Sequence, residues 1–268
     1  PDVLYALAEA IFAYIDELSA ESVEGYAREQ AVDAGERQRQ QSALVRAIVS
    51  SVPEEVDRLA AALAWPVPRT LAVLVCRHRN PERLVALVGE GALGGRLDEH
   101  VALIVPDPDA PGRRARITRS FGTRTAAFGP TVALEQAHAS YDRAMRCSAL
   151  QEAGIIPTDG LADSGEHLAA LVVHADPGAL ADLAARRLAA LDALTPMQRE
   201  RMETTLAAWL AHDGGVAEAA THLVVHPQTV RYRVARLREL LGDQLDDPQA
   251  RFELALALRA PRTKAART

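Results

Sequence analysis

The sequence has little cysteine and almost no lysine. Its two cysteines, Cys76 and Cys147, are too few for a disulfide framework or for a metal site built from thiolates. Both lie among apolar neighbours, so we expect them to be small residues of the core. Lys264 is the only lysine. A phosphate-binding loop of the G-x-x-x-x-G-K-[ST] type is therefore excluded.

Long apolar runs are also missing. No segment approaches the roughly 20 residues that a membrane-spanning helix needs, and none has the pattern of a signal peptide. The 268 residues, of which 49% are hydrophobic and 25% charged, are typical of a soluble protein with two domains. We therefore expect a cytoplasmic protein that makes no use of a membrane. The chain begins at Pro1 instead of methionine, as expected of a fragment or a renumbered sequence.

Patterns that would indicate catalysis or metal binding are weak. The sequence contains no G-x-S-x-G elbow, and its serine, histidine and aspartate residues are scattered. His222 and His226 are four positions apart, but a predicted turn separates them, and capping of a helix explains His226 better than metal binding does. We expect no catalytic residues, no metal site and no cofactor.

Helical periodicity dominates the first 64 residues. Apolar residues recur at helical spacing between Val3 and Val32, again from Leu44 to Val49, and after Pro53 at Val56, Leu59 and Leu63. These patterns predict amphipathic helices. Two interpretations stay open: the helices cover a single core, or they pair with a second subunit, although about two heptads is short for a coiled coil.

The middle of the chain combines strand and helix patterns. Residues 71–76 and 101–105 are short apolar runs bounded by proline or asparagine, as buried strands are, and "TRTAAFGP" is a candidate third strand. "PERLVALVGE" and "TVALEQAHASYDRAMRCSALQEAG" are helical, the latter ending near Gly154. A small α+β domain follows from this mixture, with a loop and helical connectors over residues 161–194.

The C-terminal part is helical and has clear boundaries. Thr195, Pro196 and Gln198 form a capping-box start for a helix that runs to His212. A short helix covers residues 217–223. After a turn, His226 is the expected N-cap of a helix that ends at Gly242, and Asp247 begins a last helix to about Arg259.

The helix that follows His226 concentrates positive charge in an acidic protein. The chain has a formal charge of -6, yet residues 225–240 contain four arginines. At about 100° per residue, Val230, Val234, Leu237 and Leu241 share a narrow buried sector flanked by Leu240. The residues predicted to point outward are Gln228, Arg231, Tyr232, Ala235 and Arg236, with Thr229 and Arg233 at the border.

Such an outward face suits duplex DNA. Arginine binds guanine or phosphate with two hydrogen bonds, and glutamine binds adenine in the same way. No acidic residue precedes Glu239 in this helix. The preceding short helix supplies the other half of a helix-turn-helix, in which the start of the second helix meets the bases. The competing interpretation is a solvated helix whose arginines pair with acids such as Glu239 and Asp243.

Residues 205–260 resemble the C-terminal helix-turn-helix of the PucR/CdaR-type transcriptional regulators. The hallmark of that family is an H-x-x-T-x-R-Y-R core followed by L-G and D-D-P, and here the core consists of His226, Thr229, Arg231, Tyr232 and Arg233. Gln228 occupies a position where the family most often has asparagine. This difference affects which DNA base is preferred at that position. Residues 66–155 resemble the family's GGDEF-like domain, and residues 1–60 resemble the end of the helical domain that often precedes it.

The expected organisation is a predominantly helical α+β protein. Its parts are an N-terminal helical region (1–64), a degenerate GGDEF-like α+β domain (65–160), a helical connector (161–194), an all-α helix-turn-helix domain (195–262) and a tail (263–268). The resemblance implies a DNA-binding transcriptional regulator with a non-catalytic sensing or dimerisation module. We expect a homodimer or higher homo-oligomer, with half-sites about 34 Å apart or a multiple of that. A small-molecule effector is a further expectation.

The expected DNA-binding residues are Gln228, Thr229, Arg231, Tyr232, Arg233 and Arg236.

Two other classes of function remain as alternatives. One is a signalling adaptor that binds a protein, which the acidic bulk of the chain would suit. The other is a nucleotide cyclase, because a GGDEF-related domain raises that chemistry. Cyclases need carboxylates to hold Mg²⁺, and the strand "TLAVLVCRHRN" has neither aspartate nor glutamate. "GGRLDEHV" is only superficially similar to the family's signature loop.

Overall fold

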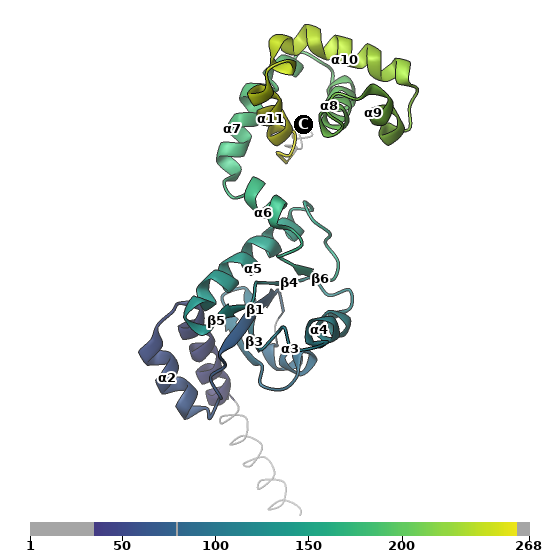
Figure 1. The fold of residues 1–268 in the computed structure, drawn as a ribbon. Helices are drawn as coiled ribbons and strands as arrows, with labels where there is room; N and C mark the ends of the chain where they lie inside the picture. Colours follow the sequence, from purple (N-terminus) through teal and green to yellow (C-terminus); the bar gives the residue numbers. More distant parts are fainter. Residues whose placement is uncertain (1–34, 79, 262–268) are drawn as a thin grey trace, which may run out of the picture. The chain divides into compact units, whose positions relative to one another are not determined.

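The structure is a computed structural model that describes residues 35–78 and 80–261. The chain forms two compact units, one ending at His167 and the other starting at Leu168 (Figure 1). The first contains a mixed sheet and the second contains only helices, which confirms the predominantly helical α+β class. No helix within the described ranges has both the length and the apolar character needed to cross a bilayer. The helices predicted between Val3 and Val32 lie outside the described residues.

The first unit is built on a six-stranded sheet with the order β2-β3-β1-β4-β6, in which β5 also pairs with β1. The central strand β1 is antiparallel to β3, β4 and β5, whereas β6 runs parallel to β4. The two apolar runs that predicted strands are β1 and β3. Both are buried along nearly their whole length because helices cover both faces of the sheet. The strands are β1 (Thr70–Cys76), β2 (Leu93–Leu97), β3 (His100–Pro106), β4 (Ala126–Phe128), β5 (Val132–Ala133) and β6 (Leu161–Asp163).

Helices lie on both sides of this sheet. α3 (Pro81–Val88) and α4 (Arg113–Phe121) cover one face, where Leu84 and Phe121 join the core formed by Leu74 and its neighbours. α5 (Ala137–Glu152) covers the other face (Figure 1). Ser140 fastens α5 to the sheet, because its Oγ accepts a hydrogen bond from Val73 N at 2.9 Å and donates one to Pro130 O at 2.7 Å.

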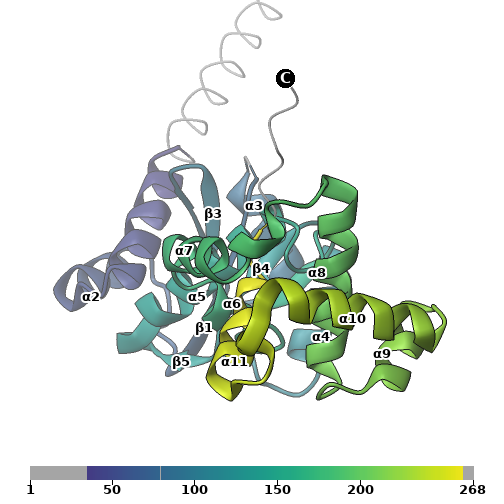
Figure 2. The ribbon, with the colours of Figure 1, turned by 90° about the horizontal axis from the view of Figure 1, so that it is seen from above.

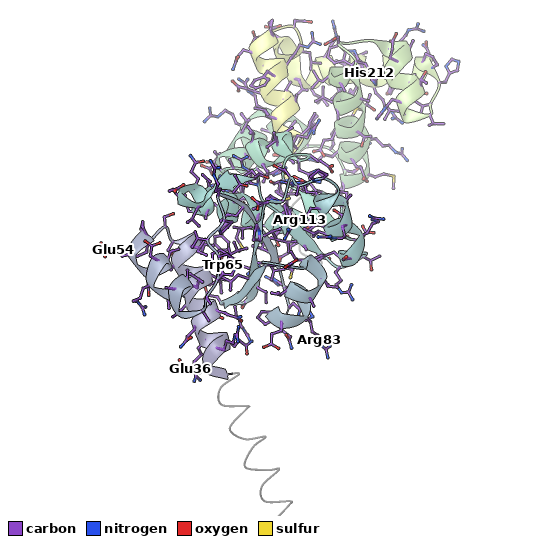
Figure 3. All side chains as sticks on the ribbon, turned by 60° about the horizontal axis from the view of Figure 1, so that its bottom comes forward. Glu36, Glu54, Trp65, Arg83, Arg113 and His212 are labelled. Carbon is purple, nitrogen blue, oxygen red and sulfur yellow. The ribbon has the colours of Figure 1, made fainter. Side chains whose placement is uncertain are left out.

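The described N-terminal helices pack on the same core. The helix over residues 35–49 buries Leu44, Val45 and Ile48, and its Ser42 Oγ accepts a hydrogen bond from Arg96 N of β2 at 3.2 Å. α2 (Pro53–Ala62) follows, and Trp65 beyond it donates from Nε1 to Gly91 O at 3.0 Å (Figure 3). The described helices thus cover the core of the first unit, and pairing with a second subunit stays a prediction.

Several elements of the first unit differ from the prediction. β2 and α4 were not predicted, since β2 contains two glycines and α4 has few apolar residues among its arginines. The helix predicted over residues 131–154 begins only at Ala137, after β5 and the 3-10 turn η1 (Leu134–Gln136). The segment expected to be a connector begins with β6. The predicted third strand, by contrast, is present as β4.

The second unit contains all the C-terminal helices that the sequence predicted. Four helices of this unit, α7, α8, α10 and α11, begin with a proline after a capping residue. The capping box is formed: Thr195 Oγ1 accepts from Gln198 N at 3.4 Å, and Gln198 Oε1 accepts from Thr195 N at 3.2 Å. The elements are α6 (Leu168–Val173), α7 (Pro177–Arg187), η2 (Ala189–Leu191), α8 (Pro196–Ala211), α9 (Val216–Leu223), α10 (Pro227–Leu241), η3 (Gly242–Leu245) and α11 (Pro248–Ala257).

Candidate nucleic-acid interface

α8, α9 and α10 pack on one another around an apolar core in the second unit (Figure 2). α9 and α10 are the two helices of the predicted helix-turn-helix. Leu206 and Trp209 of α8 and Ala220 of α9 belong to the same buried cluster as Val230 and Leu237 of α10. α10 is therefore held in a fixed orientation by the two helices that precede it.

The turn between α9 and α10 is closed by two backbone hydrogen bonds. Val225 N donates to Ala220 O at 3.0 Å, and Val224 N donates to Thr221 O at 3.2 Å, the pairing of a Schellman motif. Val224 has φ 55° and ψ 47°, a left-handed conformation in which glycine is usual. Its side chain is 89% exposed, whereas Val225 packs on the core. No pattern in the sequence indicated this strained valine.

The start of α10 follows the prediction. His226 is the N-cap, because its Nδ1 accepts a hydrogen bond from Gln228 N at 3.2 Å, and Pro227 occupies the first helical position. The first turn of the helix has no acidic residue. The N-terminus of α10 carries the positive end of the helix dipole, and no acidic side chain of the first turn neutralises it.

One side of α10 is buried as the helical periodicity predicted. Val230 and Leu237 are fully buried, and Val234 and Leu241 are 8% and 4% exposed. All four belong to the core of the second unit. Because this side is fixed in the core, the orientation of every other residue of α10 is fixed too.

The opposite side of α10 is exposed, also as predicted. We call it the arginine face and define it as Gln228, Arg231, Tyr232, Ala235 and Arg236, all of which are exposed. Tyr232 is the most exposed aromatic side chain of this face, at 71%. Thr229 and Arg233 are half-buried and lie at the border of this face.

Some arginines of α10 do pair with acids, as the competing interpretation expects. Arg236 Nη1 lies 2.5 Å from Glu239 Oε2, and Arg238 Nη2 lies 3.6 Å from Asp246 Oδ1. These pairs are exposed to solvent, so they contribute little stability and can be exchanged for another anion. Arg231 Nη1 instead meets Gln228 Oε1, at 3.5 Å, and its positive charge is not neutralised by that contact.

Arg233 has a partner that the sequence did not predict. Its Nη1 donates to Thr205 Oγ1 of α8 at 3.2 Å, and Thr205 in turn donates to Arg201 O at 2.7 Å. Thr205 is fully buried. Arg233 therefore links α10 to α8 and has only part of its guanidinium available to a ligand. Thr205 and Arg233 are 28 positions apart and lie on different helices, so no helical periodicity in the sequence indicated this contact.

Two histidines of this unit contact each other. His212, at the end of α8 (Figure 3), contacts His222 edge to face, with 5.5 Å between the ring centroids. Within residues 35–78 and 80–261, no three histidine, cysteine, aspartate or glutamate side chains gather as metal ligands would.

Three family models match the chain in the order that the sequence led us to expect. The PucR-like N-terminal domain matches residues 1–49, the GGDEF-like domain matches residues 49–150, and the PucR C-terminal helix-turn-helix domain matches residues 202–260. The chain belongs to the PucR-type family of transcriptional regulators. The helix-turn-helix match covers α9 and α10 completely, and with them the arginine face of this PucR-type regulator.

Individual relatives resemble parts of this PucR-type regulator. An uncharacterized protein in the pkwA 5' region of Thermomonospora curvata is 33% identical over an alignment of 122 residues, and the match covers 38% of this chain and 68% of that protein. The purine catabolism regulatory protein of Bacillus subtilis (strain 168) is 39% identical over 74 residues, which are 27% of this chain and only 14% of that protein.

Among solved structures, a regulator of polyketide synthase expression from Bifidobacterium adolescentis aligns with 83% of this chain and 92% of its own. The sequence identity is 18% and the TM-score is 0.41.

Proposed function

We propose that this regulator binds duplex DNA by placing the arginine face of α10 in the major groove. The observation that carries the proposal is the exposure of glutamine, arginine and tyrosine side chains on a helix whose other side is fixed in the core. A helix about 10 to 12 Å wide fits a major groove about 12 Å wide. In this geometry the first turn of α10 meets the bases and the later turns pass along the phosphates.

The residues of the interface divide into two roles. Gln228 and Thr229, in the first turn, are placed to read base edges. Arg231, Tyr232 and Arg236 are placed to bind phosphates and bases, and Arg236 exchanges Glu239 for a phosphate when DNA is bound. Arg233 contributes mainly by holding α10 against α8, with its remaining N–H groups directed at the backbone of the DNA.

The active species in this proposal is a symmetric homodimer or higher homo-oligomer. A single helix-turn-helix contacts only a few base pairs, and two copies bind half-sites that are about 34 Å apart or a multiple of that. The GGDEF-like unit serves as a non-catalytic sensing or dimerisation module. Its β1 ends in Leu74, Val75 and Cys76 and so offers no carboxylate for Mg²⁺. A DNA-binding role places the protein in the cytoplasm.

Affinity for random duplex DNA at several salt concentrations tests the proposal. We expect the affinity to fall steeply with salt, because each phosphate neutralised adds about -0.9 to the slope of log K against log salt. A signalling adaptor would instead bind duplex weakly at every salt concentration. Formation of a cyclic dinucleotide from GTP and Mg²⁺ would show that the GGDEF-like unit is an enzyme and would refute its proposed role.

A further inference from the structure

The second unit contains a helix that lies outside the family's helix-turn-helix match. That match begins at residue 202, whereas α7 spans Pro177–Arg187. α7 nevertheless packs along α11, the last helix of the match (Figure 1). Leu183 and Ala184 of α7 pack on the same buried cluster as Leu254 of α11. α7 is thus attached to the core that also holds the buried side of α10.

Arg187, the last residue of α7, is held by a carboxylate of α11. Its Nε donates to Glu253 Oε2 at 2.7 Å, and its Nη2 lies 2.7 Å from the same oxygen. The other oxygen of Glu253 accepts a hydrogen bond from Gln249 Nε2 at 3.1 Å, so both carboxylate oxygens have a partner. The side chains of Arg187 and Glu253 are only 25% and 24% exposed. Charge-assisted hydrogen bonds at this low exposure hold the guanidinium more firmly than a surface ion pair would.

The same guanidinium reaches the end of α10 through one intermediate side chain. Arg187 Nη1 donates to Gln244 Oε1 at 3.3 Å, and Gln244 Nε2 donates to Leu241 O at 3.2 Å. Leu241 is the last residue of α10, and Gln244 lies in the turn η3 that follows it. The amide of Gln244 therefore uses its acceptor on α7 and a donor on α10.

This relay acts at the opposite end of α10 from its N-cap. Arg238 and Asp246 also pair near this end, at 3.6 Å, but both are exposed, so the pair contributes little. A helix of 15 residues is about 22 Å long. A change of tilt at the C-terminal end of α10 therefore displaces the first turn, in which Gln228 and Thr229 are placed to read bases.

We propose that Arg187 is a positioning residue for DNA binding, which sets the tilt of α10 through Gln244 while Glu253 fixes it to α11. This inference rests on the proposed function of the arginine face. Arg187 acts without touching DNA: removal of its guanidinium frees the end of α10, and the arginine face then fits the phosphates less well. Because α7 follows α6 and precedes α8 in the chain, the helices before the family's DNA-binding domain have a direct hold on α10.

The test compares Arg187→Met with Arg186→Met in the full chain. Methionine keeps a long unbranched side chain and removes the guanidinium. Arg186 is the matched control, because it is an exposed arginine of the same helix and takes no part in the hydrogen bonds to Glu253 and Gln244. Affinity for random duplex is measured at a temperature at which thermal unfolding shows both variants to be folded. We expect Arg187→Met to bind about 3- to 10-fold more weakly, with a shallower slope of log K against log salt, and Arg186→Met to bind as the unchanged chain does.

Gln244→Met tests the relay itself. It removes both hydrogen bonds of the amide and leaves Arg187 paired with Glu253, so it should weaken DNA binding by a factor similar to that of Arg187→Met. The double variant should lose no more affinity than either single one, because the two residues act as one link. Without DNA, amide hydrogen exchange over residues 238–245 should be faster in Arg187→Met and Gln244→Met than in Arg186→Met.

A merely structural role would lower the midpoint of thermal unfolding and leave the affinity of the folded protein unchanged. The inference is overturned if folded Arg187→Met or Gln244→Met binds duplex as tightly as the unchanged chain, or if hydrogen exchange at the end of α10 does not change. Full affinity in Arg187→Met beside a loss in Arg231→Ala would overturn this inference alone. Full affinity in both variants would refute the proposed function of the arginine face as well.

Discussion

Arg233 of α10 donates a hydrogen bond to the buried hydroxyl of Thr205 on α8, at 3.2 Å. The two residues join the helix that carries the arginine face to the helix beneath it. Arg233 belongs to the family's H-x-x-T-x-R-Y-R core, so a position that the sequence assigned to DNA has a structural contact as well. The orientation of the arginine face depends on this contact in addition to the apolar core.

Thr205→Val should destabilise the second unit. Valine has nearly the shape of threonine, and the substitution removes the hydroxyl that accepts from Arg233. We expect a loss of about 1 kcal/mol in the free energy of unfolding, since the half-buried Arg233 recovers part of its hydrogen bonding from water. Chemical denaturation of Thr205→Val, Arg233→Gln and the double variant measures the coupling between the two residues. Additive effects would mean that the hydrogen bond contributes nothing.

Val224→Gly should make the helix-turn-helix more stable. A β-branched residue at φ 55° is strained by about 1 to 2 kcal/mol, and the 89% exposed side chain loses no packing when it is removed. Part of the gain is offset by the greater freedom of glycine in the unfolded chain, so we expect a net gain of up to about 1 kcal/mol. The midpoint of thermal unfolding measures it.

The control for that substitution is Val225→Gly. Val225 packs on the core of the second unit, so its truncation should lower the stability. A decrease in stability for both variants would contradict the strain assigned to Val224.

Gly95→Ala should destabilise the first unit. A Cβ at this position would lie 2.8 Å from Val45 Cβ and 2.9 Å from Ser42 Cα, so the helix over residues 35–49 would have to move off β2. We expect a loss of about 1 to 3 kcal/mol, as for other overpacked sites. Gly35→Ala is the control, because a Cβ there meets nothing within 4 Å and alanine favours a helix. Equal stability of the two variants would show that β2 and this helix are not in close contact.

Close packing also explains why the segment "GGRLDEHV" begins with two glycines. Gly94 approaches Val85 of α3 and Gly95 approaches Val45, so the pair lets helices on both faces come close to β2. Packing therefore accounts for both glycines without a phosphate ligand.

Glu239→Gln should raise the affinity for DNA. Glu239 pairs with Arg236 at 2.5 Å and is the first acid after the arginine face, so it competes with phosphate for the guanidinium. At low salt we expect an increase of about 3- to 10-fold in affinity for random duplex. Stability should hardly change, because the pair is exposed. Fluorescence anisotropy measures the affinity, and an unchanged or lower value would favour the interpretation of α10 as a merely solvated helix.

The sequence predicted α10 in detail because one regular period decides the orientation of its residues. Val230, Val234 and Leu237 mark the buried side, and the arginine face follows from them without any knowledge of the rest of the fold. The caps at Thr195, His226 and Asp247 were equally predictable, since a cap acts on backbone groups only a few positions away.

Features that depend on distant parts of the chain could not be predicted in this way. β2 is a strand because β3 pairs with it, although Gly94 and Gly95 have low strand propensity. A hollow at the end of β1 brings Arg124 and Ser148 together from segments that are separate in the sequence. The contact between Arg233 and Thr205 depends on the way in which α8 and α10 cross.

The salt dependence of DNA binding by Arg231→Ala and Arg236→Ala is the decisive measurement of whether the arginine face of α10 contacts DNA. Arg186→Ala is the control, since it removes the same charge from an exposed position on α7. Thermal unfolding should be unchanged in all three variants. If the arginine face binds phosphates, the two α10 variants lose affinity for duplex DNA, each with a slope of log K against log salt that is shallower by about 0.9, while the control keeps both its affinity and its slope. Full affinity and an unchanged slope in both α10 variants would contradict it.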